Sequence, residues 1–126
     1  MHKSKLAGFI IDCQTTDLDG AAGFWSCALG MPVRALAEEQ NGIYRQLDDT
    51  GLGLHVEVQA VTHPSRVHLD IETDDIEAEV RRHEKLGAQR IQMIRSWWVM
   101  EAPTGQRYCV IRAASEDFEL KASQWP

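Results

Sequence analysis

Long apolar runs, paired cysteines and an excess of basic residues are all missing from this sequence of 126 residues. No segment approaches the roughly 20 apolar residues that a membrane-spanning helix needs. The net charge of −6 argues against nucleic acid as a partner, because nucleic-acid binding needs a basic surface. Residues 1–5 are too short and polar to begin a secretory signal, so we expect a cytoplasmic protein.

The three cysteines (Cys13, Cys27 and Cys109) are an odd number and show no CxxC spacing. This pattern excludes a zinc finger or a disulfide framework and predicts reduced thiols. The rest of the composition, with 44% hydrophobic and 25% charged residues, is ordinary for a globular protein. The length suits one domain, which should bury roughly two-thirds of its unfolded surface.

Two helices of similar design are predicted. The first begins after Thr16, a suitable N-cap, and ends at Gly30; the second begins after Asp74 and ends at Gly87. Each helix carries one apolar face. The two glycines are separated by the same number of residues as Asp17 and Asp74, which indicates an internal repeat.

The repeat extends to the strands, because each helix follows one strand candidate and precedes three. We expect strands at 6–13, 32–38, 43–48 and 52–59, and again at 66–72, 88–95, 97–101 and 106–112. The chain is therefore predicted to be a single α+β domain of two βαβββ modules, about 6–59 and 66–112.

Other segments yield weaker expectations. The run 81–85 (RRHEK) is expected to be mainly a solvated helix face. Residues 113–126 show no clear period, so we expect a loosely attached C-terminal tail. His2 and His63 carry no functional signal.

Several motifs point to one family. Residues 66–75 (RVHLDIETDD) and 98–105 (WVMEAPTG), the latter followed by Tyr108-Cys109-Val110, are two of them; the third spans the first helix, with Asp17-Leu18, Phe24-Trp25 and Leu29-Gly30-Met31. Together they resemble the glyoxalase / bleomycin-resistance / extradiol-dioxygenase superfamily, also called the vicinal oxygen chelate (VOC) superfamily. The resemblance implies a curved mixed sheet around a pocket, a small-molecule ligand and a homodimer.

Alternation along two strands separates polar from apolar side chains. His55 and Glu57 share one face of 52–59, and His68 and Asp70 share one face of 66–72. We expect the apolar faces to pack under the helices and the polar faces to line the pocket. The candidate pocket residues are His55, Glu57, His68, Asp70, Trp98 and Cys109.

Metal-dependent members of the superfamily carry four ligands, and the resemblance maps these to Ile10, Glu57, His68 and Cys109. His55 replaces Glu57 if the register shifts by two residues. Ile10 cannot bind a metal, and Cys109 stands where the family has Glu. Glu57, His68 and Cys109 nevertheless have the composition of a catalytic zinc site, and a thiolate favours zinc over magnesium or manganese. The cofactor is therefore a divalent metal or none.

The same residues also have structural interpretations. His68 could serve only to hydrogen-bond Asp70, and Cys109 could serve only to fill the core. Trp97 and Trp98 point to opposite faces of their strand, so one of them is expected in the core and the other is free to contact a ligand or a second subunit.

Two functions from different classes remain open. One is a lyase, isomerase or dioxygenase, in which Glu57 shuttles a proton beside a metal or His68 acts as a metal-free base. The other is a non-catalytic protein that sequesters a small molecule, as bleomycin-resistance proteins do. The acidic balance, with Trp98, favours a cationic or polar guest, and Ile10 weakens the metal-dependent alternative.

Overall fold

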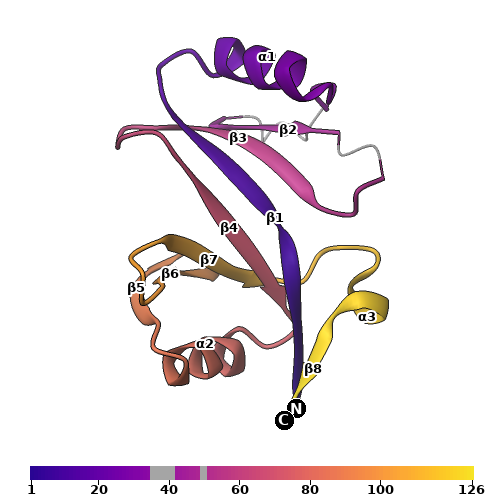
Figure 1. Cartoon of the computed structure of the whole chain (residues 1–126), viewed down its shortest axis with the longest axis vertical. Helices are drawn as coiled ribbons and strands as arrows, with labels where there is room; N and C mark the ends of the chain where they lie inside the picture. Colours follow the sequence, from indigo (N-terminus) through magenta and orange to yellow (C-terminus); the bar gives the residue numbers. More distant parts are fainter. Residues whose placement is uncertain (35–41, 49–50) are drawn as a thin grey trace. The chain divides into compact units, whose positions relative to one another are not determined.

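Figure 1 shows the computed structural model, which describes residues 1–34, 42–48 and 51–126. These residues divide into two compact units. We call Gly8–Val67 the N-unit, and Met1–Ala7 together with His68–Pro126 the C-unit. None of the helices in the described ranges is long and apolar enough to span a membrane.

The N-unit is one helix on a three-stranded sheet. It contains most of β1 (His2–Gln14), then α1 (Leu18–Leu29), β2 (Tyr44–Leu47) and β3 (His55–Val61), in the strand order β2-β3-β1. β1 and β3 run parallel, and β2 and β3 run antiparallel. Alternate apolar residues of these strands pack against α1 and form the core of this unit. The predicted strand at 32–38 lies partly outside the described residues, and Val33 forms an isolated bridge to Leu47.

The C-unit repeats this plan with one strand more. It contains β4 (Arg66–Thr73), α2 (Ile76–Lys85), β5 (Gln89–Ile94), β6 (Trp97–Glu101) and β7 (Arg107–Arg112), in the order β4-β7-β6-β5. β4 and β7 are parallel, whereas the β7–β6 and β6–β5 pairs are antiparallel. Val80, Met100 and Val110 lie in the core beside α2. The predicted α+β fold of two related modules with a mixed sheet is confirmed.

Both helices begin one residue later than predicted. The side chain of Asp17 accepts a hydrogen bond from the Gly20 backbone N–H, and Asp75 accepts one from the Ala78 N–H, each at 3.0 Å. Asp74, the predicted cap, instead accepts a hydrogen bond from the backbone N–H of Lys3. Consecutive residues that can all cap a helix leave the choice to such tertiary contacts.

The C-terminal tail is part of the C-unit, contrary to the expectation of loose attachment. It forms α3 (Phe118–Lys121) and β8 (Ser123–Trp125), and Phe118 is buried. β8 pairs antiparallel with the first residues of β1. Elements of three and four residues are too short to produce a periodic sequence pattern, so the sequence did not reveal them.

Candidate functional site

The polar face of β4 lies beside β7 in the C-unit. Asp70 is the direct neighbour of Cys109 in the register of the two strands, so their side chains emerge on the same face. His68 and Glu72 are two positions away from Asp70 and share that face. The alternation predicted for His68 and Asp70 therefore places both residues together with Cys109.

His68, Asp70 and Cys109 form a compact group. Their potential ligand atoms all lie within 4.8 Å of one another. His68 Nε2 is 3.6 Å from Asp70 Oδ1, which is an ion-pair distance rather than a hydrogen bond. Asp70 and Cys109 are buried, and His68 is partly exposed. A partly exposed imidazole above two buried donors leaves the group open to an ion or a small ligand.

The donor set of this group fits a metal of the zinc class. One imidazole, one carboxylate and one thiol are three ligand types of catalytic zinc sites, whose fourth position takes water or substrate. The sequence assigned Asp70 only to the pocket and Glu57 to the metal. The structure adds Asp70 to the candidate ligands within the C-unit, and Glu57, which belongs to the N-unit, stays a prediction.

The same face of β4 ends in a second buried carboxylate. Glu72 is 1% exposed, and its Oε2 accepts a hydrogen bond of 2.8 Å from the Ser115 hydroxyl. Its Oε1 has no hydrogen-bond partner among the described residues and lies 3.9 Å from Lys5 Nζ. The Lys5 ammonium partly offsets the cost of burying this charge.

Trp98 lies on the opposite face from this group. It pairs with Val110 and packs against the core cluster beside α2, whereas Cys109 faces the other way. The Arg90 guanidinium lies 5.1 Å from the centre of the Trp98 ring. The prediction that Trp98 lines the same pocket as Cys109 is therefore corrected, and strand alternation puts Trp97 on the Cys109 face.

His55 and Glu57 form a separate pair on β3 of the N-unit. His55 Nε2 and Glu57 Oε1 are 4.0 Å apart, and both side chains are partly buried. Glu57 is the direct neighbour of Ile10, which is 3% exposed. The Ile10 position, where the family resemblance places a ligand, thus contributes a buried apolar side chain beside Glu57.

The model of the glyoxalase-like domain family matches residues 8–111. The chain belongs to this family. Its sequence resemblance to the VOC superfamily is thereby confirmed, and no curated protein sequence matches it.

Solved structures with this fold resemble the glyoxalase-like chain at low identity. A hypothetical protein from Bacillus halodurans is 14% identical, with a TM-score of 0.61 over 89% of this chain and 96% of its own. Methylmalonyl-CoA epimerase from Mycobacterium tuberculosis is 16% identical, with a TM-score of 0.59 over 86% and 88%. A Streptomyces coelicolor methylmalonyl-CoA epimerase in complex with 2-nitronate-propionyl-CoA is 16% identical, with a TM-score of 0.55 over 89% and 96%. These likenesses confirm the fold.

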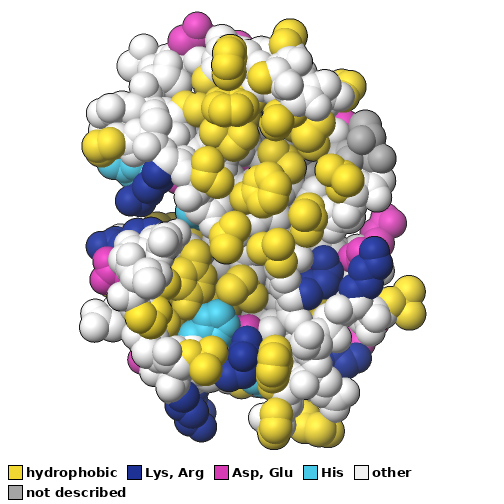
Figure 2. Space-filling model, viewed as in Figure 1, with side chains coloured by type: hydrophobic (Ala, Val, Ile, Leu, Met, Phe, Trp, Pro, Cys, Tyr) yellow, Lys and Arg dark blue, Asp and Glu magenta, His cyan; other side chains and the backbone are white. Residues whose placement is uncertain are grey.

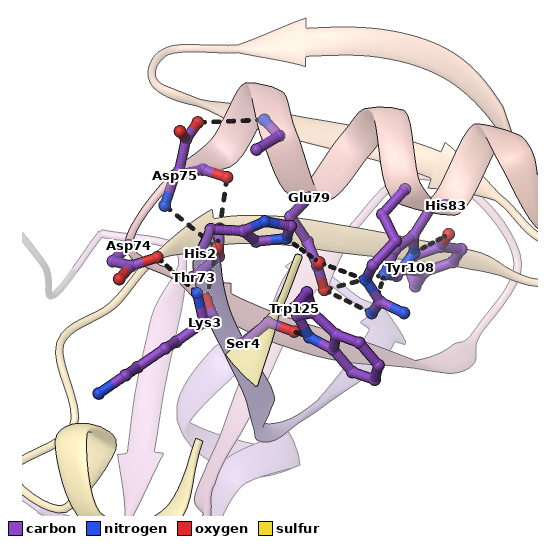
Figure 3. Close-up of polar contacts among 12 residues, drawn as sticks. His2, Lys3, Ser4, Thr73, Asp74, Asp75, Glu79, His83, Tyr108 and Trp125 are labelled. Carbon is purple, nitrogen blue, oxygen red and sulfur yellow. Dashed lines mark hydrogen bonds and ion pairs between the residues drawn. The ribbon is translucent and has the colours of Figure 1, made fainter. Parts of the chain in front are cut away.

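The glyoxalase-like chain also contains a buried charge network that the sequence did not predict (Figure 3). Glu79 on α2 is 0% exposed and lies 2.8 Å from His2 Nε2 and 3.0 Å from His83 Nε2. Arg82 donates two hydrogen bonds to the same carboxylate. Arg82 also stacks 3.7 Å over the ring of Trp125.

The partners of Glu79 determine its charge, which makes His83 Nε2 a hydrogen-bond donor. Burial alone would raise the pKa of Glu79, but hydrogen bonds from Arg82 and His83 hold this pKa well below its ordinary value. Because a carboxylate only accepts, His83 Nε2 donates to it, and Nδ1 forms a hydrogen bond of 2.7 Å with the Tyr108 hydroxyl. Burial, with the Glu79 charge, raises the pKa of Tyr108, so its hydroxyl keeps the proton.

The expectation of a mainly solvated run at 81–85 holds for Arg81, Glu84 and Lys85, which are exposed, whereas His83 is buried and Arg82 is engaged by Glu79. The network corrects the view that His2 is uninformative. The spacing of Glu79, Arg82 and His83 at helical intervals is the one signal in the sequence that could have indicated it. The role of the network is to hold β1 and β8 against α2.

Proposed function

We propose that this glyoxalase-like chain is a small-molecule enzyme of the isomerase or lyase type that binds a divalent metal at His68, Asp70 and Cys109. The observation that carries the proposal is the convergence of their ligand atoms within 4.8 Å. Deprotonated Asp70 and Cys109 carry two negative charges, which match the charge of one divalent cation. The thiolate favours zinc over magnesium and manganese.

Bound at these residues, such an ion would supply a Lewis acid that polarises a carbonyl oxygen of the substrate. His68 would then be a ligand, so another residue must move the proton. The sequence expectation gives that role to Glu57, which belongs to the N-unit and whose Oε1 lies 4.0 Å from His55 Nε2, and this role stays a prediction. The epimerase relatives are isomerases by name, and they support this reaction class over the others.

A dioxygenase has less support from the same residues. Non-haem iron oxygenases use two histidines and one carboxylate, whereas this group has one histidine and a thiol. The observation that favours the second candidate, a non-catalytic binding protein, is the buried Ile10 at a family ligand position. In that case His68 and Asp70 would bind a polar or cationic guest without turning it over.

Metal analysis of untagged protein separates the two candidates. We expect about one zinc ion per chain after dialysis against trace zinc, and loss of that ion in His68→Ala and Cys109→Ser. His63→Ala is the matched control, since the His63 ring hydrogen-bonds the Pro64 carbonyl and lies outside the group. A metal-free wild type, or a zinc content unchanged by both substitutions, would contradict the enzyme proposal.

A further inference from the structure

A pocket lies in the N-unit and shares no lining residue with the group proposed to bind metal. Its volume is about 290 Å³. It opens beside α1, between the end of β1 and the start of β4. The lining residues are Ile11, Asp12, Cys13, Trp25, Ser65, Arg66 and Val67.

The side chains that face this pocket are mostly apolar. Ile11 and Cys13 are on the face of β1 that packs towards α1, where Trp25 also lies. Strand alternation puts Val67 on the opposite side of β4 from Arg66. Val67 is 60% exposed, so it forms an apolar rim at the mouth of the pocket.

The charges near the pocket balance one another. Arg66 Nε lies 3.9 Å from Asp12 Oδ2, so the two charged lining residues form an ion pair. Burial raises the pKa of the Cys13 thiol, although a hydrogen bond with Trp25 acts against this. The thiol is therefore neutral at physiological pH, and it is not an activated nucleophile. The Ser65 hydroxyl accepts a hydrogen bond from the Gln14 backbone N–H.

The aromatic wall extends to the surface of α1. The rings of Phe24 and Trp25 meet edge to face with their centres 5.1 Å apart, and Phe24 is exposed. Figure 2 shows hydrophobic side chains gathered at the surface in the upper part of the view, where Figure 1 places α1. An aromatic pair of one exposed and one partly buried ring beside an apolar hollow suits the face of a flat ring.

We propose that this pocket binds a neutral, flat molecule of one or two aromatic rings. An apolar cavity of about 150 Å³ suffices to hold one benzene ring, so about twice that volume suits a two-ring molecule. The balanced Asp12–Arg66 pair gives no reason to select a charged ligand. The site uses none of the residues proposed to hold a metal, so it is a second binding site of the chain.

Calorimetric titration with indole, a neutral two-ring probe, tests the site. We expect indole to bind the wild type and its affinity to fall by about tenfold in Val67→Asp, which puts a carboxylate at the apolar rim. Val67→Thr, of the same shape, should give a smaller loss. Leu52→Asp is the matched control, because Leu52 is a similarly exposed hydrophobic residue of the N-unit outside the pocket.

No binding to the wild type, equal binding to both Val67 variants, or an equal loss in Leu52→Asp would overturn the proposal. Zinc content measured on the same samples keeps the two proposals distinguishable. The Val67 variants should retain the metal even where they lose indole, and His68→Ala should retain indole even where it loses the metal.

Discussion

At the scale of single residues, the buried carboxylates on β4 dominate the chemistry of the C-unit. Asp70 and Glu72 are both buried on one strand face, and Lys5 forms an ion pair with Glu72. We expect such a face to attract a cation, because burial strengthens the field of each charge. Cys109 adds a donor that would become a thiolate on binding the proposed metal, so we expect the group to prefer soft divalent ions.

Gly8 is the residue at which a single added methyl group should matter most. A Cβ at this position would lie 1.9 Å from the carbonyl oxygen of His55, so the parallel pairing of β1 and β3 would have to shift. We expect Gly8→Ala to lower the free energy of unfolding by about 1–3 kcal/mol, measured by urea denaturation.

Gly23→Ala is the control for that measurement. Nothing lies within 4 Å of a Cβ at Gly23, which is inside α1, so alanine there should raise the free energy of unfolding by up to about 1 kcal/mol. Equal effects of the two substitutions would refute the close approach of Gly8 to His55.

Predictions for single residues were correct where the alternation of a strand alone decides which face of the sheet a side chain occupies. Alternation correctly placed His68 and Asp70 together, and the family motif placed Cys109 beside them. Alternation also required Trp97 and Trp98 to face opposite ways, but it could not show which of them faces α2. That choice depends on the register of β6 against β7, which brings Trp98 opposite Val110.

At the scale of elements, α2 is held by electrostatics as well as by its apolar face. Glu79 connects α2 to β1 through His2, and Arg82 connects it to β8 through Trp125. The indole N–H of Trp125 donates to the Ser4 hydroxyl, which closes the connection between the two strands. Three elements that are distant in sequence thus depend on one buried carboxylate.

Glu79→Gln should therefore destabilise the protein at neutral pH. Removal of the buried charge leaves Arg82 without its ion-pair partner, and we expect a loss of about 3 kcal/mol in the free energy of unfolding. Glu77→Gln on the same helix is the control, with an expected loss below about 1 kcal/mol because its ion pairs are at the surface.

The effect should depend on pH in a defined direction. The folded protein holds the pKa of Glu79 below its ordinary value of 4.5, so its stabilisation is complete above that pH and is lost as the pH falls further. Urea denaturation at successive acidic pH values should show the wild type approaching Glu79→Gln. A difference that stays constant from pH 7 to pH 3 would show that Glu79 is not a stabilising carboxylate.

Predictions for helices and strands were limited because a local sequence pattern cannot show which contacts an element makes with distant parts of the chain. Periodicity located both long helices and most strands. The first residue of α2 depended on whether Asp74 was free to cap it, and the backbone N–H of Lys3 engages Asp74 instead. The network around Glu79 was missed because His2 and Trp125 are far from α2 in the sequence, so no local pattern connects them.

At the scale of the whole molecule, the family resemblance predicts a homodimer. The edge strand of the C-unit, β5, offers a surface for it, because Ile91, Met93 and Ile94 are exposed hydrophobic residues on a strand with one open side. We expect light scattering at micromolar concentration to give the mass of a dimer. Met93→Lys should shift the mass towards the monomer.

Leu120→Lys is the control, since Leu120 is an exposed hydrophobic residue on α3 rather than on the strand edge. A monomeric mass of the wild type would count against the dimer. A mass that both substitutions leave unchanged would exclude β5 as its interface.

The pairing of β8 with the start of β1 brings residues 2 and 125 side by side. A short linker could therefore join the two ends of the chain with little disturbance of the sheet. In such a circular permutant, with new ends opened in the loop at 62–65, the two segments of the C-unit would become one uninterrupted stretch. If the permutant folds, the fold of the two units does not depend on which of them comes first along the chain.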